Sequence, residues 1–209
     1  MGEGRAPDGT PVMRAETLRA MQDVQAEAGS MCERFGFGWM LDTVEGERLV
    51  KHGGAVGGQL SSFEFVPSRG YACTVLTNCE SGREVRDTVA QLCLRSFTGL
   101  QRVLPAADRT LVSTLGELAG RYRQRIAELE LHVEGGALVL HDRQPGWLAE
   151  VAPRAVEPPP SRLELVAHDR AVVRDGPHRG ETAEFLRDGN GAVAFLRWDG
   201  RLSRRDARS

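Results

Sequence analysis

Short apolar segments separated by glycine-rich turns recur along most of this chain, and they restrict it to antiparallel sheet structure. Clear turns are predicted at Gly135-Gly136 and at Asp188-Gly189-Asn190-Gly191, since glycine and asparagine tolerate the positive φ of tight hairpins. Helical patterns interrupt the strands before residue 99, whereas beyond residue 112 one strand follows another. We therefore predict an α+β protein, in which an antiparallel sheet with flanking helices precedes a small antiparallel β-barrel or meander.

Two helices are predicted in the first region. Residues 15–28 contain no interior glycine or proline, and their apolar residues recur on one face. The second helix is predicted to begin at the capping box Ser81-Gly82-Arg83-Glu84 and to end at Gly99. The apolar stripe of this second helix consists of Val85, Val89, Leu92 and Phe97.

Strands are predicted between these helices. Residues 35–41 alternate between large apolar side chains and glycine or methionine, which is typical of a strand with one apolar face. The segment 48–51 predicts the next strand, and a glycine-rich bend at 53–58 separates it from a strand at 60–66. A turn at Pro67-Ser68-Arg69-Gly70 then leads into an apolar strand at 71–77, which completes this predicted sheet.

Composition excludes several classes of function. The net charge is -2, with 41% hydrophobic and 27% charged residues, so no global field attracts nucleic acid or an anionic membrane. No apolar stretch approaches the ~20 residues of a membrane span. Residues 1–8 lack the apolar core of a signal peptide. If Met1 is the true start, we predict a cytoplasmic protein. If an N-terminal half with a signal peptide precedes it, we predict an exported one.

Metal and cofactor chemistry is not expected. The four cysteines show no C-x-x-C spacing, and we interpret them as reduced thiols that are mostly in the core. The five histidines are scattered without the compact spacing of a metal site. We therefore predict no metal and no cofactor. Those cysteines are Cys32, Cys73, Cys79 and Cys93.

A domain boundary is predicted at 99–112, where small residues and Pro105 lack any periodicity. The two domains are then residues 1–98 and residues 113–205. Short strands with regular turns fill the second domain, and the arginine-rich tail at 201–208 is interpreted as a solvated end.

Several motifs in the first domain occur in the order and spacing of a known family. Gly36-Phe37-Gly38-Trp39 precedes Lys51-His52-Gly53-Gly54-Ala55-Val56-Gly57-Gly58, and a strand ending Val75-Leu76-Thr77-Asn78 follows. Residues 10–98 with these motifs resemble the β-lactamase-related serine hydrolases, which include class C β-lactamases, DD-peptidases and esterases. The resemblance implies a partial β-lactamase-like sheet. Residues 113–205 are similar to the lipocalin-like accessory domain that often follows such hydrolases.

The resemblance implies acyl-transfer chemistry. In the family a serine in Ser-x-x-Lys attacks a carbonyl, and the lysine with a tyrosine in Tyr-x-Asn moves the proton. A third motif lies on a strand beside the nucleophile, where small residues admit the substrate. His52, Gly53 and Gly54 match this third motif, and the N–H of Ala55 would donate to the oxyanion. An alternative register places Lys51-His52-Gly53 on the Lys-Thr-Gly form of the motif.

The other two catalytic motifs are missing from the sequence. Lys51 is the sole lysine, so Ser-x-x-Lys would require serine where Arg48 stands, and neither tyrosine begins a Tyr-x-Asn. We therefore expect no catalytic residue in this chain and no activity of the chain alone. Complemented by an N-terminal half, it would act on a small-molecule ester, amide or peptide substrate. The alternative is a non-catalytic module that binds a ligand or partner.

Overall fold

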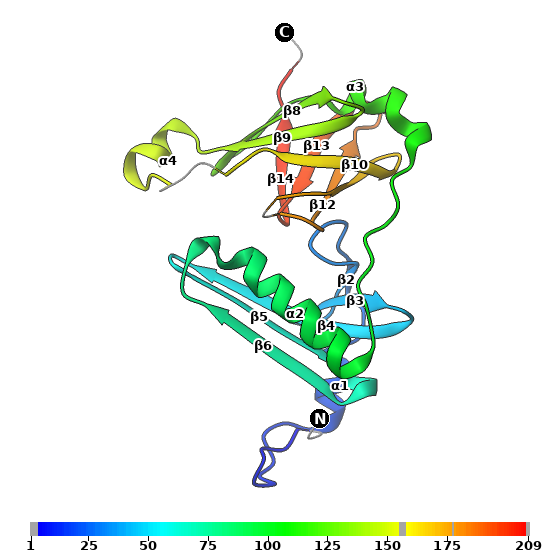
Figure 1. Ribbon diagram of the computed structural model, residues 1–209, viewed down its shortest axis with the longest axis vertical. Helices are drawn as coiled ribbons and strands as arrows, with labels where there is room; N and C mark the ends of the chain where they lie inside the picture. The colour runs from blue at the N-terminus through cyan, green and yellow to red at the C-terminus, as the bar shows by residue number, and fades with distance from the viewer. Residues whose placement is uncertain (1–3, 155–157, 177, 208–209) are drawn as a thin grey trace. The chain divides into compact units, whose positions relative to one another are not determined.

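The computed structural model describes residues 4–154, 158–176 and 178–207, and the chain divides into two compact units, Met1–Val103 and Leu104–Ser209. The first unit contains a six-stranded antiparallel sheet with helices, and the second contains a closed barrel of eight antiparallel strands (Figure 1). The α+β fold class predicted from the sequence is confirmed.

The sheet of the first unit follows chain order, with each strand antiparallel to the next. Its strands are β1 (Ala26–Glu27), β2 (Arg34–Phe35), β3 (Met40–Val44), β4 (Glu47–Val56), β5 (Gln59–Val66) and β6 (Tyr71–Thr77). Tight turns make this order possible. Glu45 and Gly46 both have positive φ, the geometry that matches the natural twist of a two-residue hairpin.

Helix α2 (Arg83–Thr98) covers one face of this sheet, whereas α1 (Ala15–Ala20) is short and has no buried residue. Ala90 and Leu94 are the buried residues of α2, and Leu94 packs in a core cluster with residues of β3 to β6. The helix ends at Gly99, whose φ of 78° suits a left-handed C-cap. The members of the cluster are Val44, Leu49, Val66, Tyr71, Leu94 and Leu100.

The predicted helix at 15–28 and strand at 35–41 were both too long. The chain leaves helical geometry after Ala20, and Gln25 donates a hydrogen bond to Phe35 across the short β1–β2 pair. Tertiary pairing overrides helix propensity here. Residues 36–39 turn instead of continuing a strand, because the Gly36 N–H bonds to the Trp39 carbonyl and Gly38 has a φ of 75°.

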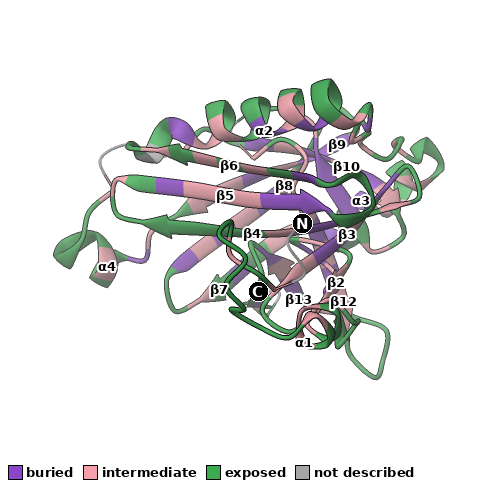
Figure 2. Cartoon of the chain, turned by 90° about the horizontal axis from the view of Figure 1, so that it is seen from below, coloured by how far each residue is buried: buried purple, intermediate pink, exposed green. Residues whose placement is uncertain are grey.

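Three further predictions in the first unit were wrong. The glycine-rich segment 53–56 continues β4, and the chain turns only at Gly57-Gly58. The capping box does not form, because Gly82 is the N-cap of α2 and no side chain caps the helix. The predicted apolar stripe of α2 is exposed (Figure 2), since the helix packs through Ala90 and Leu94 instead.

The barrel of the second unit closes where β9 (Ala137–Arg143) pairs with β10 (Ser161–Ala167). Its other strands are β7 (Gly120–Gln124), β8 (Ala127–Glu134), β11 (Arg170–Val173), β12 (Thr182–Arg187), β13 (Val193–Trp198) and β14 (Arg201–Arg205). Helices η3 (Arg109–Thr114) and α3 (Leu115–Leu118) precede the barrel, and α4 (Gly146–Val151) lies between β9 and β10. Helices η1 (Pro67–Arg69) and η2 (Glu80–Gly82) lie in the first unit.

One continuous apolar cluster forms the core of the barrel unit, and it includes Tyr122, Leu196 and Trp198. The Tyr122 hydroxyl donates to the Leu118 carbonyl at 2.7 Å, which satisfies the polar group of this buried ring. The tail predicted as a solvated end is a paired strand over residues 201–205, although Arg201, Leu202 and Arg204 are exposed as predicted. These residues form β14, which pairs with β13 and β7 and buries Ser203.

Candidate substrate-binding edge

The predicted site residues lie in the C-terminal half of strand β4, where only one edge of the strand is paired. From Val50 to Val56, β4 pairs with β5, but its pairing with β3 stops at Lys51, which lies opposite Met40. Within the described part of the chain, no strand pairs with the other edge of residues 52–56. The four residues predicted as the site, His52 to Ala55, are brought together on this exposed edge.

The turns at the two ends of β4 determine where its backbone groups point. Val44 pairs with Glu47, and Val56 pairs with Gln59, each across two residues. The two residues of each pair therefore exchange backbone hydrogen bonds. Along an antiparallel strand, the N–H and C=O groups of successive residues point alternately to one neighbouring strand and to the other. The N–H and C=O groups of Gly53 and Ala55 consequently point to the open edge, away from β5. The Ala55 N–H is the group that the sequence predicted as an oxyanion donor.

The neighbouring strand β5 leaves little room for a side chain at Gly53 and Gly54. A Cβ at Gly54 would stand 2.8 Å from the Ser61 hydroxyl oxygen, and a Cβ at Gly53 would stand 3.2 Å from the Ser61 carbonyl oxygen. Neither glycine is covered by side chains, because both are exposed. The backbone can therefore be approached closely by a bound molecule.

The His52 side chain occupies one of the backbone acceptors of this edge, the Gly53 carbonyl. Its Nδ1 lies 2.7 Å from the Gly53 carbonyl oxygen, so the ring engages that acceptor when Nδ1 carries the proton. Side chains alternate between the faces of a strand, which places His52 on the same face as Val50. His52 also lies directly opposite Phe63 of β5.

An aromatic group beside His52 was not predicted as part of the site. The Trp39 ring lies 5.9 Å from that of Phe63 and 5.3 Å from that of Phe65, and Phe63 and Phe65 are 5.6 Å apart. These rings belong to segments that are distant in sequence, so no local pattern could reveal their contact. Phe65 is buried, whereas Trp39 and Phe63 are partly exposed and form an apolar shelf beside His52 that suits an apolar side chain of a ligand.

Lys51 and Tyr71 have partners away from this edge. Lys51, which the alternative register would place in the site, forms an ion pair with Asp42. The Tyr71 hydroxyl lies 3.5 Å from a Glu64 carboxylate oxygen, and burial raises the pKa of Tyr71 well above its ordinary value. Tyr71 therefore stays protonated at any physiological pH.

Neither a metal site nor a membrane-spanning helix is found among the described residues. In residues 4–154, 158–176 and 178–207, no group of three or more histidine, cysteine, aspartate or glutamate side chains is arranged to hold a metal ion. Across the same ranges, no helix has both the length and the apolarity that a membrane crossing requires.

The barrel unit contains a separate cavity of about 700 Å³. Ala194 and Phe195 contribute apolar surface to it. Its charged lining holds both signs, since Arg187, Arg204 and Arg205 lie there together with Glu117, Asp188 and Asp206. Arg187 is already bound by Asp169 and Glu117.

Comparisons with known proteins extend this description. No family model matches the chain. Penicillin-binding protein 4 of Amycolatopsis lactamdurans is 37% identical over 84 residues, which amount to 37% of this chain and 22% of that protein. SurE has a TM-score of 0.58 at 24% identity, covering 93% of this chain and 42% of SurE. SurE with D-Leu has a TM-score of 0.57 at 23% identity, covering 93% of this chain and 44% of SurE.

The chain thus spans less than half the length of the proteins that it matches. A segment of 84 residues is similar to penicillin-binding protein 4, and the fold of the chain matches part of SurE.

Proposed function

We propose that this chain supplies the substrate-binding strand of an acyl-transfer serine hydrolase, whose nucleophile lies on another polypeptide segment. The observation that carries the proposal is the open edge of β4 at residues 52–56. Glycines 53 and 54 leave room for an extended acyl group along this edge, and the outward N–H of Ala55 can donate to a developing oxyanion. We also propose that residues 1–98 are part of a β-lactamase-like domain and that residues 113–205 are a lipocalin-like domain.

The substrate class follows from the same edge. An extended peptide can form main-chain hydrogen bonds with a free strand edge, while its side chains contact the flanking surface. The shelf of Trp39 and Phe63 suits an apolar side chain of such a peptide. SurE was solved with D-Leu, an apolar amino acid. We therefore infer a peptide or a related small ester or amide as the substrate.

Catalysis requires groups that this sequence does not contain. No Ser-x-x-Lys and no Tyr-x-Asn occurs in its 209 residues. The purified chain should therefore show no serine-dependent turnover of a chromogenic ester or cephalosporin. Clear turnover that a serine-directed inhibitor abolishes would contradict the proposal. A Ser-x-x-Lys segment encoded in frame upstream of Met1 would support it.

A chimera allows the strand itself to be tested. This chain would replace the superposable part of SurE, and hydrolysis of a chromogenic ester would be measured. Ala55→Pro removes the outward N–H without removing a bond to β5, and loss of an oxyanion donor lowers kcat by about 10²-fold or more. Thr74→Pro is the matched control, since it removes an outward N–H at the far edge of the same sheet. Equal activities of the two variants, or a folded chimera without turnover, would contradict the proposal.

The barrel cavity favours a second candidate function, binding of a ligand without catalysis. Phe195 can bury apolar surface and the Arg204 guanidinium can bind a carboxylate, so we infer a small amphipathic anion that lies against Arg204 and away from the lining carboxylates Asp188 and Asp206. Decanoate should then raise the melting temperature of the chain, and Arg204→Gln should reduce that increase. An unchanged melting temperature at millimolar decanoate would eliminate this candidate.

A further inference from the structure

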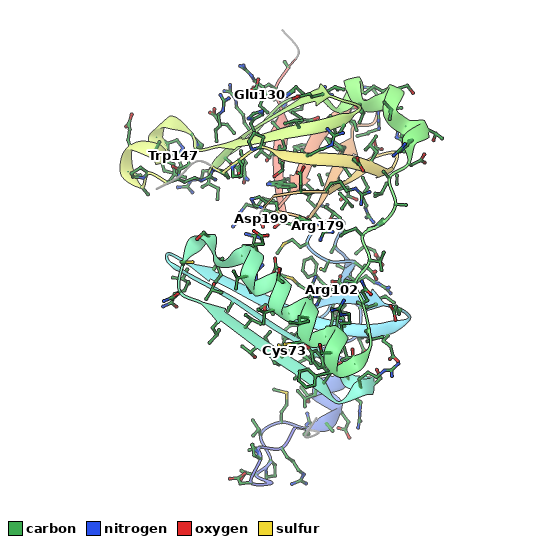
Figure 3. The ribbon with its side chains drawn as sticks, in the orientation of Figure 1. Cys73, Arg102, Glu130, Trp147, Arg179 and Asp199 are labelled. Atoms are coloured by element: carbon green, nitrogen blue, oxygen red, sulfur yellow. The ribbon has the colours of Figure 1, made fainter. Side chains whose placement is uncertain are left out.

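Two cysteines lie at the contact between helix α2 and strand β6. Cys73 belongs to β6 and Cys93 to α2, and both pack against the core cluster that contains Leu94 and Tyr71. Both are free thiols. Figure 3 labels Cys73, which lies on β6 next to the helix. A bond between these two sulfurs would join the helix to the sheet.

The alternation of side chains along β6 turns Cys73 toward the helix. Successive side chains of a strand point to opposite faces, so Cys73 shares a face with Tyr71 and Val75. Tyr71 is buried in the core cluster that α2 also enters, whereas Ala72 and Thr74 on the opposite face are exposed. The face of β6 that carries Cys73 is therefore the face that α2 covers.

The helix runs back along β6 and brings Cys93 level with Cys73. A Cβ at Gly82, the N-cap of α2, would touch the side chain of Thr77 at the end of β6, and the C-terminal part of α2 shares a core cluster with Tyr71 at the start of β6. From Gly82, Cys93 lies about 16 Å along the helix axis. From Thr77, Cys73 lies about 14 Å back along the strand. The two cysteines thus occupy nearly the same position along two elements that pack together.

The two thiols interact with each other. Burial is the main cause that raises the pKa of Cys73, and the charge of Cys93 and a hydrogen bond between the two side chains raise it further. Thiols in contact need side-chain rotation, and no change of fold, to form a disulfide. Both cysteines belong to the contact of helix and strand, so their proximity does not depend on what lies beyond β6 or outside α2.

We propose that Cys73 and Cys93 form a reversible disulfide, which clamps α2 to β6 when the chain meets a small disulfide such as glutathione disulfide. One protein thiolate attacks a sulfur of glutathione disulfide, breaks that S–S bond and releases one glutathione thiolate. The second protein thiolate attacks the protein sulfur of the mixed disulfide and releases the other glutathione thiolate. The protein loses two electrons and two protons, and glutathione disulfide becomes two glutathione thiols.

This clamp is independent of the acyl chemistry proposed for β4. The new bond closes the segment 73–93, which contains most of α2. A disulfide that fits the folded chain stabilises it, because it restricts the unfolded chain. By linkage, the folded chain must then form the bond more readily than the unfolded chain does.

Equilibration with reduced and oxidised glutathione tests this difference. The variant Cys32→Ser/Cys79→Ser retains only Cys73 and Cys93, so an intramolecular disulfide has one assignment. Its equilibrium constant for oxidation would be measured in native buffer and in concentrated guanidinium chloride. We expect a constant at least tenfold larger in native buffer, because the fold holds the sulfurs together.

Moving one thiol to the other face of β6 provides the matched control. In the same variant, Cys73→Ser with Thr74→Cys changes the closed segment by a single residue but points the thiol away from α2. Its equilibrium constant should be no larger in native buffer than in guanidinium chloride. Circular dichroism establishes that each variant is folded in native buffer.

Peptide mapping of the unaltered chain provides a second measurement without any substitution. Trypsin yields a peptide 70–83 with Cys73 and Cys79, and a peptide 87–95 with Cys93. After oxidation, tandem mass spectrometry should find Cys93 linked to Cys73, and dithiothreitol should separate the peptides. A link from Cys93 to Cys79, no linked peptide, equal equilibrium constants in the two solvents, or a tenfold enhancement in the control would each overturn the proposal.

Discussion

Removing Arg102 should destabilise the first unit strongly, because it would leave the Glu64 carboxylate buried without its cation. Glu64 is 3% exposed on β5, and Arg102 forms an ion pair with it from the segment that follows α2. Tyr71 reaches Glu64 only at 3.5 Å and cannot replace the charge. Removal of one partner of a buried pair costs ~3–5 kcal/mol. Because the Arg102 side chain is 31% exposed and partly screened by water, we expect about 2–4 kcal/mol for Arg102→Met.

A double-mutant cycle separates this loss from the loss of packing. Free energies of unfolding would be measured in urea for Arg102→Met, for Glu64→Gln and for both together. Amide exchange in β5 would report on the first unit alone, because β5 lies wholly within that compact unit. The double variant should be more stable than Arg102→Met alone, because it carries no buried unpaired charge. A cost below about 1 kcal/mol for Arg102→Met, or strict additivity in the cycle, would refute the reasoning.

Three more predictions concern single groups. Tyr122→Phe should cost about 1 kcal/mol in a urea melt of the barrel, since the Leu118 carbonyl loses its donor, and an unchanged midpoint would contradict this. Burial, and after it the neighbouring Cys93, raises the pKa of Cys73. Iodoacetamide at pH 8 should therefore label the exposed Cys79 before Cys73, as followed by mass spectrometry. Equal labelling rates of the two cysteines would contradict this. Burial raises the pKa of Asp169, but the hydrogen bonds and charge of Arg187 outweigh burial and leave the pKa below 3.8. The resulting stabilisation is present above pH 3.8 and is lost as the pH falls further. Asp169→Asn should therefore weaken the dependence of the melting temperature on pH in that acid range.

Strands with a clear alternation and a turn at each end were predictable from the sequence. The segments 60–66 and 71–77, and the hairpin about Gly135-Gly136, were found close to their observed bounds. Local chemistry is sufficient there, because turn residues and period-two patterns specify the same register.

Features that depend on distant partners were not predictable. The glycines of β4 indicate a bend when read alone, but Gln59 to Ser62 pair with them and extend the strand. Helix α2 has apolar residues on two sides, and its sequence does not reveal that Ala90 and Leu94 meet the sheet. The aromatic shelf brings Trp39 to Phe63, a contact set by the order of strands.

Amide exchange along β4, followed residue by residue by NMR on the full chain, tests the central claim most directly. His52 and Gly54, whose N–H groups point to β5, should exchange slowly, whereas Gly53 and Ala55 should exchange at nearly the rate of an unstructured peptide. Slow exchange at Gly53 and Ala55, equal to that of their neighbours, would mean that this edge is already occupied and that no substrate can bind along it.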